Sequence, residues 1–444
     1  MMDWRKLISA KRLGMEAYHT KGGDDRSDFL RDYDRLIFSA PFRRLQNKTQ
    51  VFPLPGSIFV HNRLTHSLEV SCVGRSLGNK VSRNILKRHP ELADSLVGEI
   101  GNIVSAACLA HDLGNPPFGH SGERAIAAYF TEGKGQALRE QLSDEEWNDM
   151  IHFEGNANAF RLLTHQFNGR RRGGFALTYS TLAAIVKYPY SSHYCGGKSK
   201  FGFFHTEADT FRTIADELGL IRLSGEGEPL RYCRHPLVFL VEAADDICYQ
   251  MMDIEDAYKL KILTREETVA LLTPFIEESR QGHLTEVLDL VTDHNEQIAY
   301  LRSKVIGILI DECADAFIRN EEAILNGTFA EPLIKHTSAR CRQAYKRCTE
   351  VAVQKIYRSR DVLDIELAGF RIINTLIELM IDAVSHPDNA YSRLLIDRVS
   401  EQYDLHAPTL YGKIQAVFDY LSGMTDVFAL DLYRKINGNS LPAV

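Results

Sequence analysis

Hydrophobic residues recur every three or four positions along most of the chain, and the strict alternation typical of strands is scarce. One stripe with this spacing consists of Val305, Leu309, Cys313, Ala316 and Phe317. A second consists of Leu363, Leu367, Phe370, Ile373, Leu376, Ile377 and Met380. Because residues at this spacing share one face of a helix, each stripe predicts an amphipathic helix with that face in a core. The pattern therefore predicts a mainly α-helical protein.

Three segments interrupt the helical pattern. FNGRRRGG (residues 167–174) and SSHYCGGKSKFGFF (residues 191–204) are rich in glycine and polar residues, which indicates exposed loops or a lid. RLSGEGEPLRY (residues 222–232) is a third break, and it fits a short β-hairpin. Internal repeats are not evident, so we expect one mainly α unit with at most this hairpin.

Composition narrows the class of protein. Of the 444 residues, 44% are hydrophobic and 25% are charged, which is typical of a globular chain with a large core. The formal net charge of −7 argues against a broad nucleic-acid-binding face, since duplex affinity depends on many contacts from Lys and Arg to phosphates. Basic clusters at residues 170–172 and 340–347 are sufficient for a small phosphorylated ligand.

The sequence also indicates a compartment. The segment MMDWRKLISAKRLG lacks the apolar stretch and small-residue cleavage site of a signal peptide. No window approaches the ~20 uninterrupted apolar residues of a membrane helix. The eight cysteines form no C-x-x-C pair, and several lie in apolar helical patterns, which favours reduced thiols. We therefore expect a cytoplasmic protein without disulfides or membrane contact.

Candidate chemistry begins with two histidines at positions that the helical pattern assigns to the core. Val104, Cys108 and His111 fall on one face of an apolar segment, and the chain continues directly into Asp112. His66 shares a face with the apolar residues that follow it, in NRLTHSLEVSCVGRSL. A buried histidine is either a hydrogen-bonded structural residue or a ligand, and each position alone fits both interpretations.

Asp245 is a third polar residue on an apolar stripe. It lies between Val241 and Cys248 on one face of the predicted helix PLVFLVEAADDICYQMMDIED. Burial of an unpaired carboxylate costs several kcal/mol or more, so Asp245 needs a cation, a proton or strong hydrogen-bond donors. An ion pair with Arg63 and ligation of a metal both meet this need.

The four polar residues His66, His111, Asp112 and Asp245 can satisfy one another by holding one divalent metal ion. Their nitrogen and oxygen donors favour Mn²⁺, Fe²⁺, Mg²⁺, Ni²⁺ or Zn²⁺, with open positions for water or substrate oxygens. A closed structural zinc site is disfavoured because no cysteine belongs to the set. Such a site can form only if the three separate segments that carry these residues converge in the fold.

The turn HDLGNPPFGHSGE ends the apolar segment abruptly at Gly114 and two prolines. A sharp return of the chain keeps His120 close to the metal residues. Glu123 falls in the first turn of the next predicted helix, where it can orient His120 as a proton-transfer pair. Alternatively, Glu123 only complements the helix dipole and His120 is a loop residue.

The ordered pattern of His66, His111, Asp112 and Asp245 resembles the HD superfamily of metal-dependent phosphohydrolases. Within that superfamily, six segments resemble the deoxyguanosine triphosphate triphosphohydrolase (dGTPase) family. They are DRLIFSAPFRRLQNKTQVFPL, NRLTHSLEV, HDLGNPPFGHSGE, HFEGNANAFRL, EAADDICYQMMDIEDA and DYLSGMTDVFALDLY, and they extend from residue 34 to residue 433. The resemblance implies one dGTPase-like unit over residues 1–444, with an HD-type helical core over 60–260 and a helical C-terminal part, 261–444, packed on it.

The resemblance implies hydrolysis of a deoxynucleoside triphosphate (dNTP) to the deoxynucleoside and tripolyphosphate, by attack of water at the α-phosphorus. It implies that His66, His111, Asp112 and Asp245 bind the metal, and that His120, supported by Glu123, is the acid/base group. For the substrate it implies that Gln50, Tyr249 and Asp253 surround the deoxyribose, and that Asn115 and His152 approach the phosphates. Arg63 and Lys187 are the cations that we assign to the phosphate chain, with Lys200 as a further candidate.

The resemblance also implies one divalent ion, with Mn²⁺ or Mg²⁺ favoured, and dGTP as the favoured substrate. Members of this family form homo-oligomers, often hexamers, and the resemblance extends to an effector nucleotide and weak binding of single-stranded DNA. Two alternative functions stay open. One is another HD phosphodiesterase or nucleotidase, and the other is a regulator that binds nucleotide or single-stranded DNA without turnover.

Overall fold

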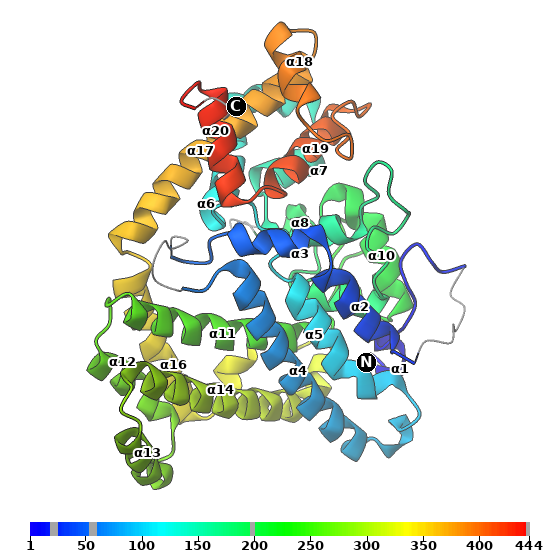
Figure 1. Cartoon of the computed structure of the whole chain (residues 1–444). Coiled ribbons are helices and arrows are strands. Elements are labelled where there is room, and N and C mark those ends of the chain that lie inside the picture. The colour runs from blue at the N-terminus through cyan, green and yellow to red at the C-terminus, as the bar shows by residue number, and fades with distance from the viewer. Residues whose placement is uncertain (18–24, 53–59, 196–199, 441–444) are drawn as a thin grey trace.

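The computed structural model describes residues 1–17, 25–52, 60–195 and 200–440, and over these ranges the regular structure is helical (Figure 1). Extended pairing in the described ranges consists of isolated antiparallel bridges, one of which joins Arg222 to Tyr232 in the predicted hairpin segment. The mainly α fold class, with at most a short hairpin, is therefore confirmed.

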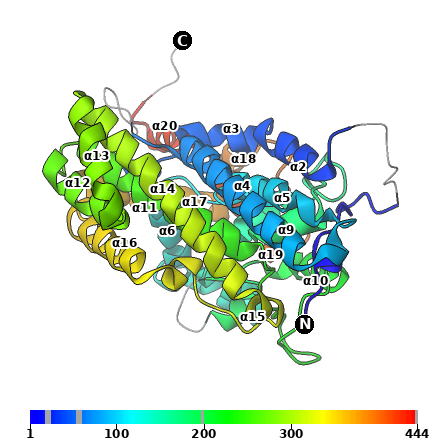
Figure 2. The ribbon, with the colours of Figure 1, turned by 90° about the horizontal axis from the view of Figure 1, so that it is seen from below.

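The helices around the centre of the molecule share one apolar cluster, here called the central core. They are α2 (Asp28–Ile37), α4 (Arg63–Arg88), α5 (Ile100–Ala110), α9 (Tyr179–Ile185), α11 (Val238–Lys259), α14 (His294–Arg319) and α16 (Ala339–Val351). In the view of Figure 2, α14, α4 and α5 lie side by side. The buried faces of α4, α5 and α11 meet in the central core, so polar residues where these faces meet lie close together.

A second apolar cluster, here called the upper core, lies beside the first. It joins α6 (His120–Thr131) and α7 (Asp144–Ile151) to α17 (Arg360–Ser385), α19 (Leu410–Ser422) and α20 (Asp426–Ile436). Figure 1 shows α17 rising from the region of α11 and α16 to the top of the molecule. Segments more than 200 residues apart therefore build the upper core together, and the division at residue 260 stays a prediction.

Other helices complete the two cores. They are α1 (Trp4–Leu7), α3 (Ala40–Arg44), α8 (Gly155–Thr164), α10 (Ala208–Glu217), α12 (Arg265–Leu272), α13 (Glu278–Leu290), α15 (Glu321–Leu325) and α18 (Ala390–Asp397). Several begin at a side chain that accepts a hydrogen bond from the first turn, as Ser27 does for α2 and Ser39 for α3. Such caps fix where these helices start.

The first predicted stripe is confirmed, since Val305, Leu309, Cys313 and Phe317 are fully buried. The second is correct only for the upper half of α17. Leu363 and Leu367 are 43% and 71% exposed, so their assignment to a core was wrong. The heptad-like spacing continues along α17, whereas the residues of α17 that join the upper core with α6, α18, α19 and α20 begin at Phe370.

The predicted loops differ in exposure. Residues 167–174 form an exposed loop, as expected. Residues 196–199 lie outside the described part, but Phe201, Phe203 and Phe204 are fully buried, so the prediction of an exposed segment was wrong there. Three aromatic rings bury enough apolar surface to hold residues 201–204 against the protein.

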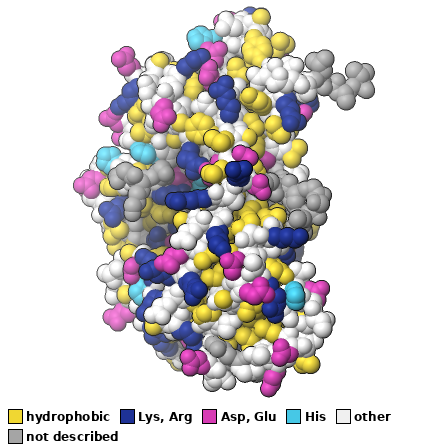
Figure 3. Space-filling model, turned by 90° about the vertical axis from the view of Figure 1, so that its left-hand side faces the viewer, with side chains coloured by type: hydrophobic (Ala, Val, Ile, Leu, Met, Phe, Trp, Pro, Cys, Tyr) yellow, Lys and Arg dark blue, Asp and Glu magenta, His cyan; other side chains and the backbone are white. Residues whose placement is uncertain are grey.

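The charged side chains can be followed on one face of the molecule. Figure 3 shows acidic and basic side chains interspersed over the face in view. The eight cysteines are unpaired thiols. Within the described ranges, no helix combines the length and apolarity needed to cross a membrane.

Candidate active site

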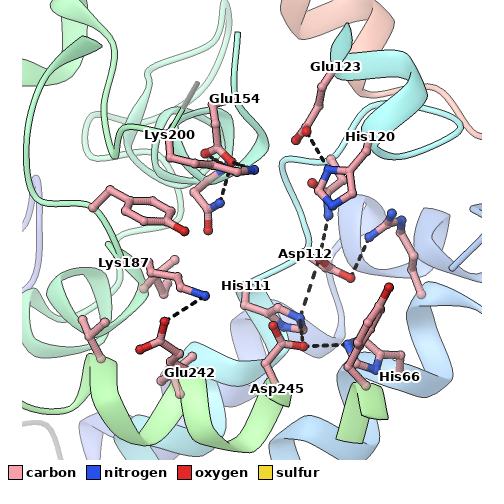
Figure 4. A pocket seen from close by; sticks show the side chains of 18 of the residues that line it. His66, His111, Asp112, His120, Glu123, Glu154, Lys187, Lys200, Glu242 and Asp245 are labelled. Atoms are coloured by element: carbon pink, nitrogen blue, oxygen red, sulfur yellow. Dashed lines mark hydrogen bonds and ion pairs between the residues drawn. The ribbon is translucent and has the colours of Figure 1, made fainter. Parts of the chain in front are cut away.

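A cavity of about 290 Å³ lies between the central helices and the start of α6 (Figure 4). It is lined by eleven of the thirteen residues that the sequence singled out as site residues. They are Gln50, Arg63, His66, His111, Asp112, Asn115, His120, Glu123, Lys187, Asp245 and Tyr249. Lys200, the further candidate, also lines it, whereas Asp253 and His152 are not among the lining residues.

One wall of the cavity carries the four candidate metal ligands. Single donor atoms of His66, His111 and Asp112 all lie within 4.8 Å of one another. Asp245 Oδ1 lies 3.1 Å from His66 Nε2 and 3.6 Å from His111 Nε2. The three predicted segments therefore converge, and we call these four residues the ligand cluster.

Helix geometry explains how these side chains meet. His66 lies in the first turn of α4, where Asn62 and Thr65 form a reciprocal cap that fixes the start of the helix. His111 follows the last turn of α5, and its Nδ1 lies 2.7 Å from the carbonyl oxygen of Cys108. Donation from Nδ1 to that carbonyl leaves the lone pair of Nε2 directed at the cluster, as metal-binding histidines require.

Asp112 is held at both oxygens. Arg63 Nη1 donates to Oδ2 at 2.8 Å, and Asn115 Nδ2 donates to Oδ1 at 2.5 Å. Arg63 therefore neutralises Asp112 rather than Asp245, which contacts the two imidazoles. The contacts that orient a ligand in this way are typical of the outer shell of metal sites.

Charges in the ligand cluster are strongly coupled. Burial disfavours ionisation of Asp245, but the imidazoles of His111 and His66 hold its pKa well below the usual range. Burial also disfavours the imidazolium of His111, yet Asp112 and Asp245 raise its pKa to about 9. Without a metal, the carboxylates therefore retain a proton on the imidazole, and a divalent cation can take the place of that positive charge.

His120 and Glu123 form a pair above the ligand cluster (Figure 4). His120 Nδ1 lies 2.8 Å from Glu123 Oε2, and Gly155 N donates to Glu123 Oε1 at 2.9 Å. A Cβ atom at residue 155 would lie 2.7 Å from that oxygen, so glycine permits the contact. Despite the opposing effect of burial, the hydrogen bond with His120 lowers the pKa of Glu123. His120 and Glu123 are thus in contact, and their role in proton transfer stays a prediction.

The opposite wall carries two lysines that are paired with buried glutamates. Lys187 Nζ lies 3.1 Å from Glu242 Oε1, and Lys200 Nζ lies 2.7 Å from Glu154 Oε1 (Figure 4). The sequence reasoning missed both glutamates. Glu242 lies one turn before Asp245 on α11, a spacing that could have identified it. Glu154 caps α8 at the end of a loop, where periodicity carries no signal.

Two more lining residues lie at the Tyr249 end of the cavity. Tyr249 stacks on Tyr357, with ring centroids 6.0 Å apart, and Tyr357 donates its hydroxyl hydrogen to Asp253 Oδ2 at 2.7 Å. Asp253 therefore lies behind the tyrosines, where burial raises its pKa to about 8. Gln50 Oε1 is buried and has no hydrogen-bond partner among the described residues, which makes it a candidate to bind a ligand.

The sequence did not identify Tyr357, and His152 is not among the residues that line the cavity. Tyr357 was missed because it follows an irregular helical turn, Ala352–Ile356, outside any regular stripe. His152 caps the end of α7, and its Nδ1 lies 3.1 Å from the carbonyl oxygen of Asn148. Burial lowers the pKa of His152.

Comparison with known proteins shows which family the chain resembles. The HD domain family matches residues 63–186, and the phosphohydrolase-associated domain matches residues 335–435. A deoxyguanosinetriphosphate triphosphohydrolase-like protein of Pseudomonas aeruginosa is 37% identical, with both chains covered completely. One from Synechocystis is 38% identical over 99% of this chain and 100% of the relative. The deoxyguanosinetriphosphate triphosphohydrolase of Yersinia enterocolitica is 30% identical over 98% and 99%.

The chain belongs to the deoxyguanosinetriphosphate triphosphohydrolase family. It is therefore a hydrolase of the metal-dependent HD superfamily, and the resemblance inferred from its motifs is confirmed. The HD match includes His66, His111, Asp112, His120 and Glu123. Asp245 lies between the two matched segments, and the second match includes Tyr357 and most of the upper-core helices.

Proposed function

We propose that this hydrolase cleaves a dNTP, with dGTP favoured, into the deoxynucleoside and tripolyphosphate. The observation that carries the proposal is that one cavity combines the ligand cluster, a histidine–glutamate pair and a wall with two lysines. These are the parts that water attack on a phosphate chain requires. The names of the full-length relatives support the same reaction.

The charges of the cavity support a metal-dependent reaction. Five carboxylates line it, against three side chains of Lys and Arg, so a polyanion meets an excess of negative charge. A divalent ion, Mn²⁺ or Mg²⁺ by preference, corrects this imbalance, and His66, His111, Asp112 and Asp245 would hold it. When bound, such an ion supplies a Lewis acid that polarises a phosphoryl oxygen and lowers the pKa of water.

We assign the proton transfer to His120. In the reaction, a bond forms from water oxygen to the α-phosphorus while the bond from that phosphorus to the 5′-oxygen breaks. Water loses a proton and the 5′-oxygen gains one. With Nδ1 held by Glu123, the other ring nitrogen of His120 can exchange the proton at the 5′-oxygen or at the attacking water.

Lys187 and Lys200 are proposed to bind the phosphate chain, because they can exchange a glutamate partner for a phosphate oxygen. Arg63 and Asn115 were assigned to the phosphates from the sequence. Their contacts with Asp112 support an additional role, which is to orient a metal ligand beside the phosphate.

Gln50 and Tyr249 are proposed to contact the deoxyribose. An amide with an unsatisfied buried oxygen can bind a hydroxyl, and an aromatic wall can exclude another. Asp253 supports this wall indirectly. It accepts a hydrogen bond from Tyr357, and Tyr357 stacks on Tyr249. Contacts of Asp253 and His152 with substrate stay predictions.

A product assay tests the function. The metal-loaded protein is incubated with each of the four dNTPs, alone and in pairs, and deoxynucleoside and tripolyphosphate are resolved by ion-exchange chromatography. We expect equal amounts of the two products, with dGTP the best substrate. Release of monophosphate or pyrophosphate would instead identify another nucleotidase, and binding without products would identify a regulator.

The paired incubations also test an effector nucleotide, since an effector accelerates hydrolysis of a second dNTP. Homo-oligomer formation, with a hexamer as the expected state, is tested by light scattering of the full chain. Weak binding of single-stranded DNA and a cytoplasmic location are further expectations, which electrophoretic mobility and cell fractionation check.

A further inference from the structure

The turn between the ligand cluster and His120 has an unusual backbone. Phe118 has a φ of +63°, and Gly119, which precedes His120, has a φ of +55°. An aromatic residue rarely adopts this left-handed conformation, which persists only where the surroundings impose it. The position of His120 therefore depends on what holds Phe118.

Asp426, the first residue of α20, holds the backbone of Phe118. Its Oδ1 accepts the N–H of Phe118 at 2.9 Å, and its Oδ2 accepts the N–H of Thr49 at 2.8 Å. The carboxylate is buried and binds two backbone segments of the cavity wall. The segment at Phe118 ends two residues before His120, and the segment at Thr49 continues directly into Gln50.

Lys48 makes a second link between the same segments. Its buried Nζ donates to the carbonyl oxygen of Asn115 at 2.6 Å and to that of Ser422 at 2.7 Å. Ser422 is the last residue of α19. Lys48 and Asp426 therefore tie the turn to the junction of α19 and α20, which lies more than 300 residues further along the chain.

Helix α17 supports the turn from another side. Ser121 Oγ donates to the carbonyl oxygen of Glu366 at 2.5 Å. A Cβ atom at residue 369 would lie 2.5 Å from Cβ of Phe118, so Gly369 lets the phenylalanine pack against the helix backbone. The C-terminal helices thus hold both the turn before α6, at Phe118, and the first turn of α6, at Ser121.

We infer that Asp426 is a positioning residue, which acts through the backbone of Phe118 and Thr49 to set His120 and Gln50 in the cavity. The inference rests on the proposed function, in which His120 transfers the proton. A carboxylate is needed because it offers an acceptor to each N–H, whereas an amide turns its NH₂ group toward one of them. Asp426 touches neither substrate nor metal residues in this account.

A double-mutant cycle tests the inference in the full-length, metal-loaded protein. Asp426→Asn is measured in the wild-type and His120→Ala backgrounds. Asp431→Asn, on the exposed side of α20 and paired with Lys435, is the matched control. We expect Asp426→Asn to lower kcat about 10- to 100-fold with little change in KM or metal content, as for a small misplacement of a reacting group.

In the His120→Ala background, we expect Asp426→Asn to cause no further loss of kcat, because the proton-transfer group that it positions is gone and Gln50 is proposed only to bind the sugar. An equal loss in both backgrounds indicates a structural role and overturns the inference. Should Asp426→Asn fail to fold, Lys48→Met removes the second link to the turn, and the same pattern is expected from it.

Hydrogen exchange separates this inference from the proposed function. If the wild-type protein releases no tripolyphosphate, the proposed function fails, but backbone exchange still reads the position of the turn. We expect Asp426→Asn and Lys48→Met to accelerate exchange over residues 113–121 and to leave α5 unchanged. Unchanged exchange over 113–121 in both variants overturns the inference whatever the substrate.

Discussion

Two walls of the cavity, the first formed by the ligand cluster and the second by the turn that carries His120, are held in place in different ways. The ligand cluster extends from α4, α5 and α11, whose apolar faces form the central core, so its geometry follows from helix packing. The wall with His120 belongs to a turn that is tied to Lys48 and Asp426. The His120 side chain is 72% exposed, compared with 2% for His66. The position of the first wall thus follows from packed helices, whereas that of the second depends on hydrogen bonds to Lys48 and Asp426.

This difference predicts that changes in the ligand cluster alter metal binding and stability together. Asp245→Asn removes the carboxylate shared by His66 and His111, so we expect metal affinity to fall by more than about 100-fold, since even outer-shell partners contribute 10- to 100-fold. Turnover should fall to the level of the metal-stripped protein, and the gain in thermal stability on adding metal should disappear. Plasma emission spectrometry and calorimetry measure both. Full metal occupancy in this variant would contradict the ligand role.

Changes in the second wall should leave the metal in place. His120→Ala removes the proton-transfer group, and we expect kcat to fall about 10²- to 10⁴-fold. Metal content should equal that of the wild type, because the change removes no residue of the ligand cluster. Steady-state kinetics with metal analysis checks this prediction. An active variant with metal bound would refute the assignment of His120.

Asn115 lies at the border between the walls. Asn115→Ala removes the hydrogen bond to Asp112 Oδ1, and we expect metal affinity to fall about 10- to 100-fold. Asn156→Ala is the control, since Asn156 also lines the cavity but binds Glu154. Metal titration monitored by calorimetry compares the two variants. Equal losses would show that Asn115 has no special role in orienting Asp112.

The smallest effect is expected from the lysines. Lys187→Gln keeps a polar side chain but removes the charge, so we expect KM for the dNTP to rise about tenfold with a smaller change in kcat, given about 1.5–3 kcal/mol for a hydrogen bond to a charged group. Glu242 retains Arg234 as its partner, so the fold should persist. Lys134→Gln, at an exposed ion pair, is the control. An unchanged KM would exclude Lys187 from phosphate binding.

The mainly α fold and the inward position of the candidate ligands could be predicted because both follow from periodicity, whereas the convergence of the three segments is a property of the fold. Helical spacing turns His66 and Asp245 toward the interior, and the packing of α4 on α11 then places them 3.1 Å apart. Periodicity failed for Leu367, because a stripe shows which face is apolar and not how much of it is covered. It failed also for Phe201, Phe203 and Phe204, whose glycine-rich surroundings masked their burial.

Pairing between side chains could not be predicted in the same way. Spacing left two alternatives for Asp245, an ion pair with Arg63 or ligation of a metal, and the fold pairs Arg63 with Asp112 instead. Asp253 shares a helix face with Tyr249, yet Tyr357 of a distant segment binds it behind that wall. Neither choice is local, since each depends on which segment approaches from elsewhere.

The sequence by itself determined the type of fold, the residues of the ligand cluster and the pairing of His120 with Glu123, because these need only helical spacing and chemical type. The tertiary structure decided which charges neutralise one another and what holds the turn before His120. Asp426 contacts Phe118 across 308 positions of sequence. Such a contact depends on how α20 packs beside the turn before α6, and the spacing of residues along the chain does not specify that.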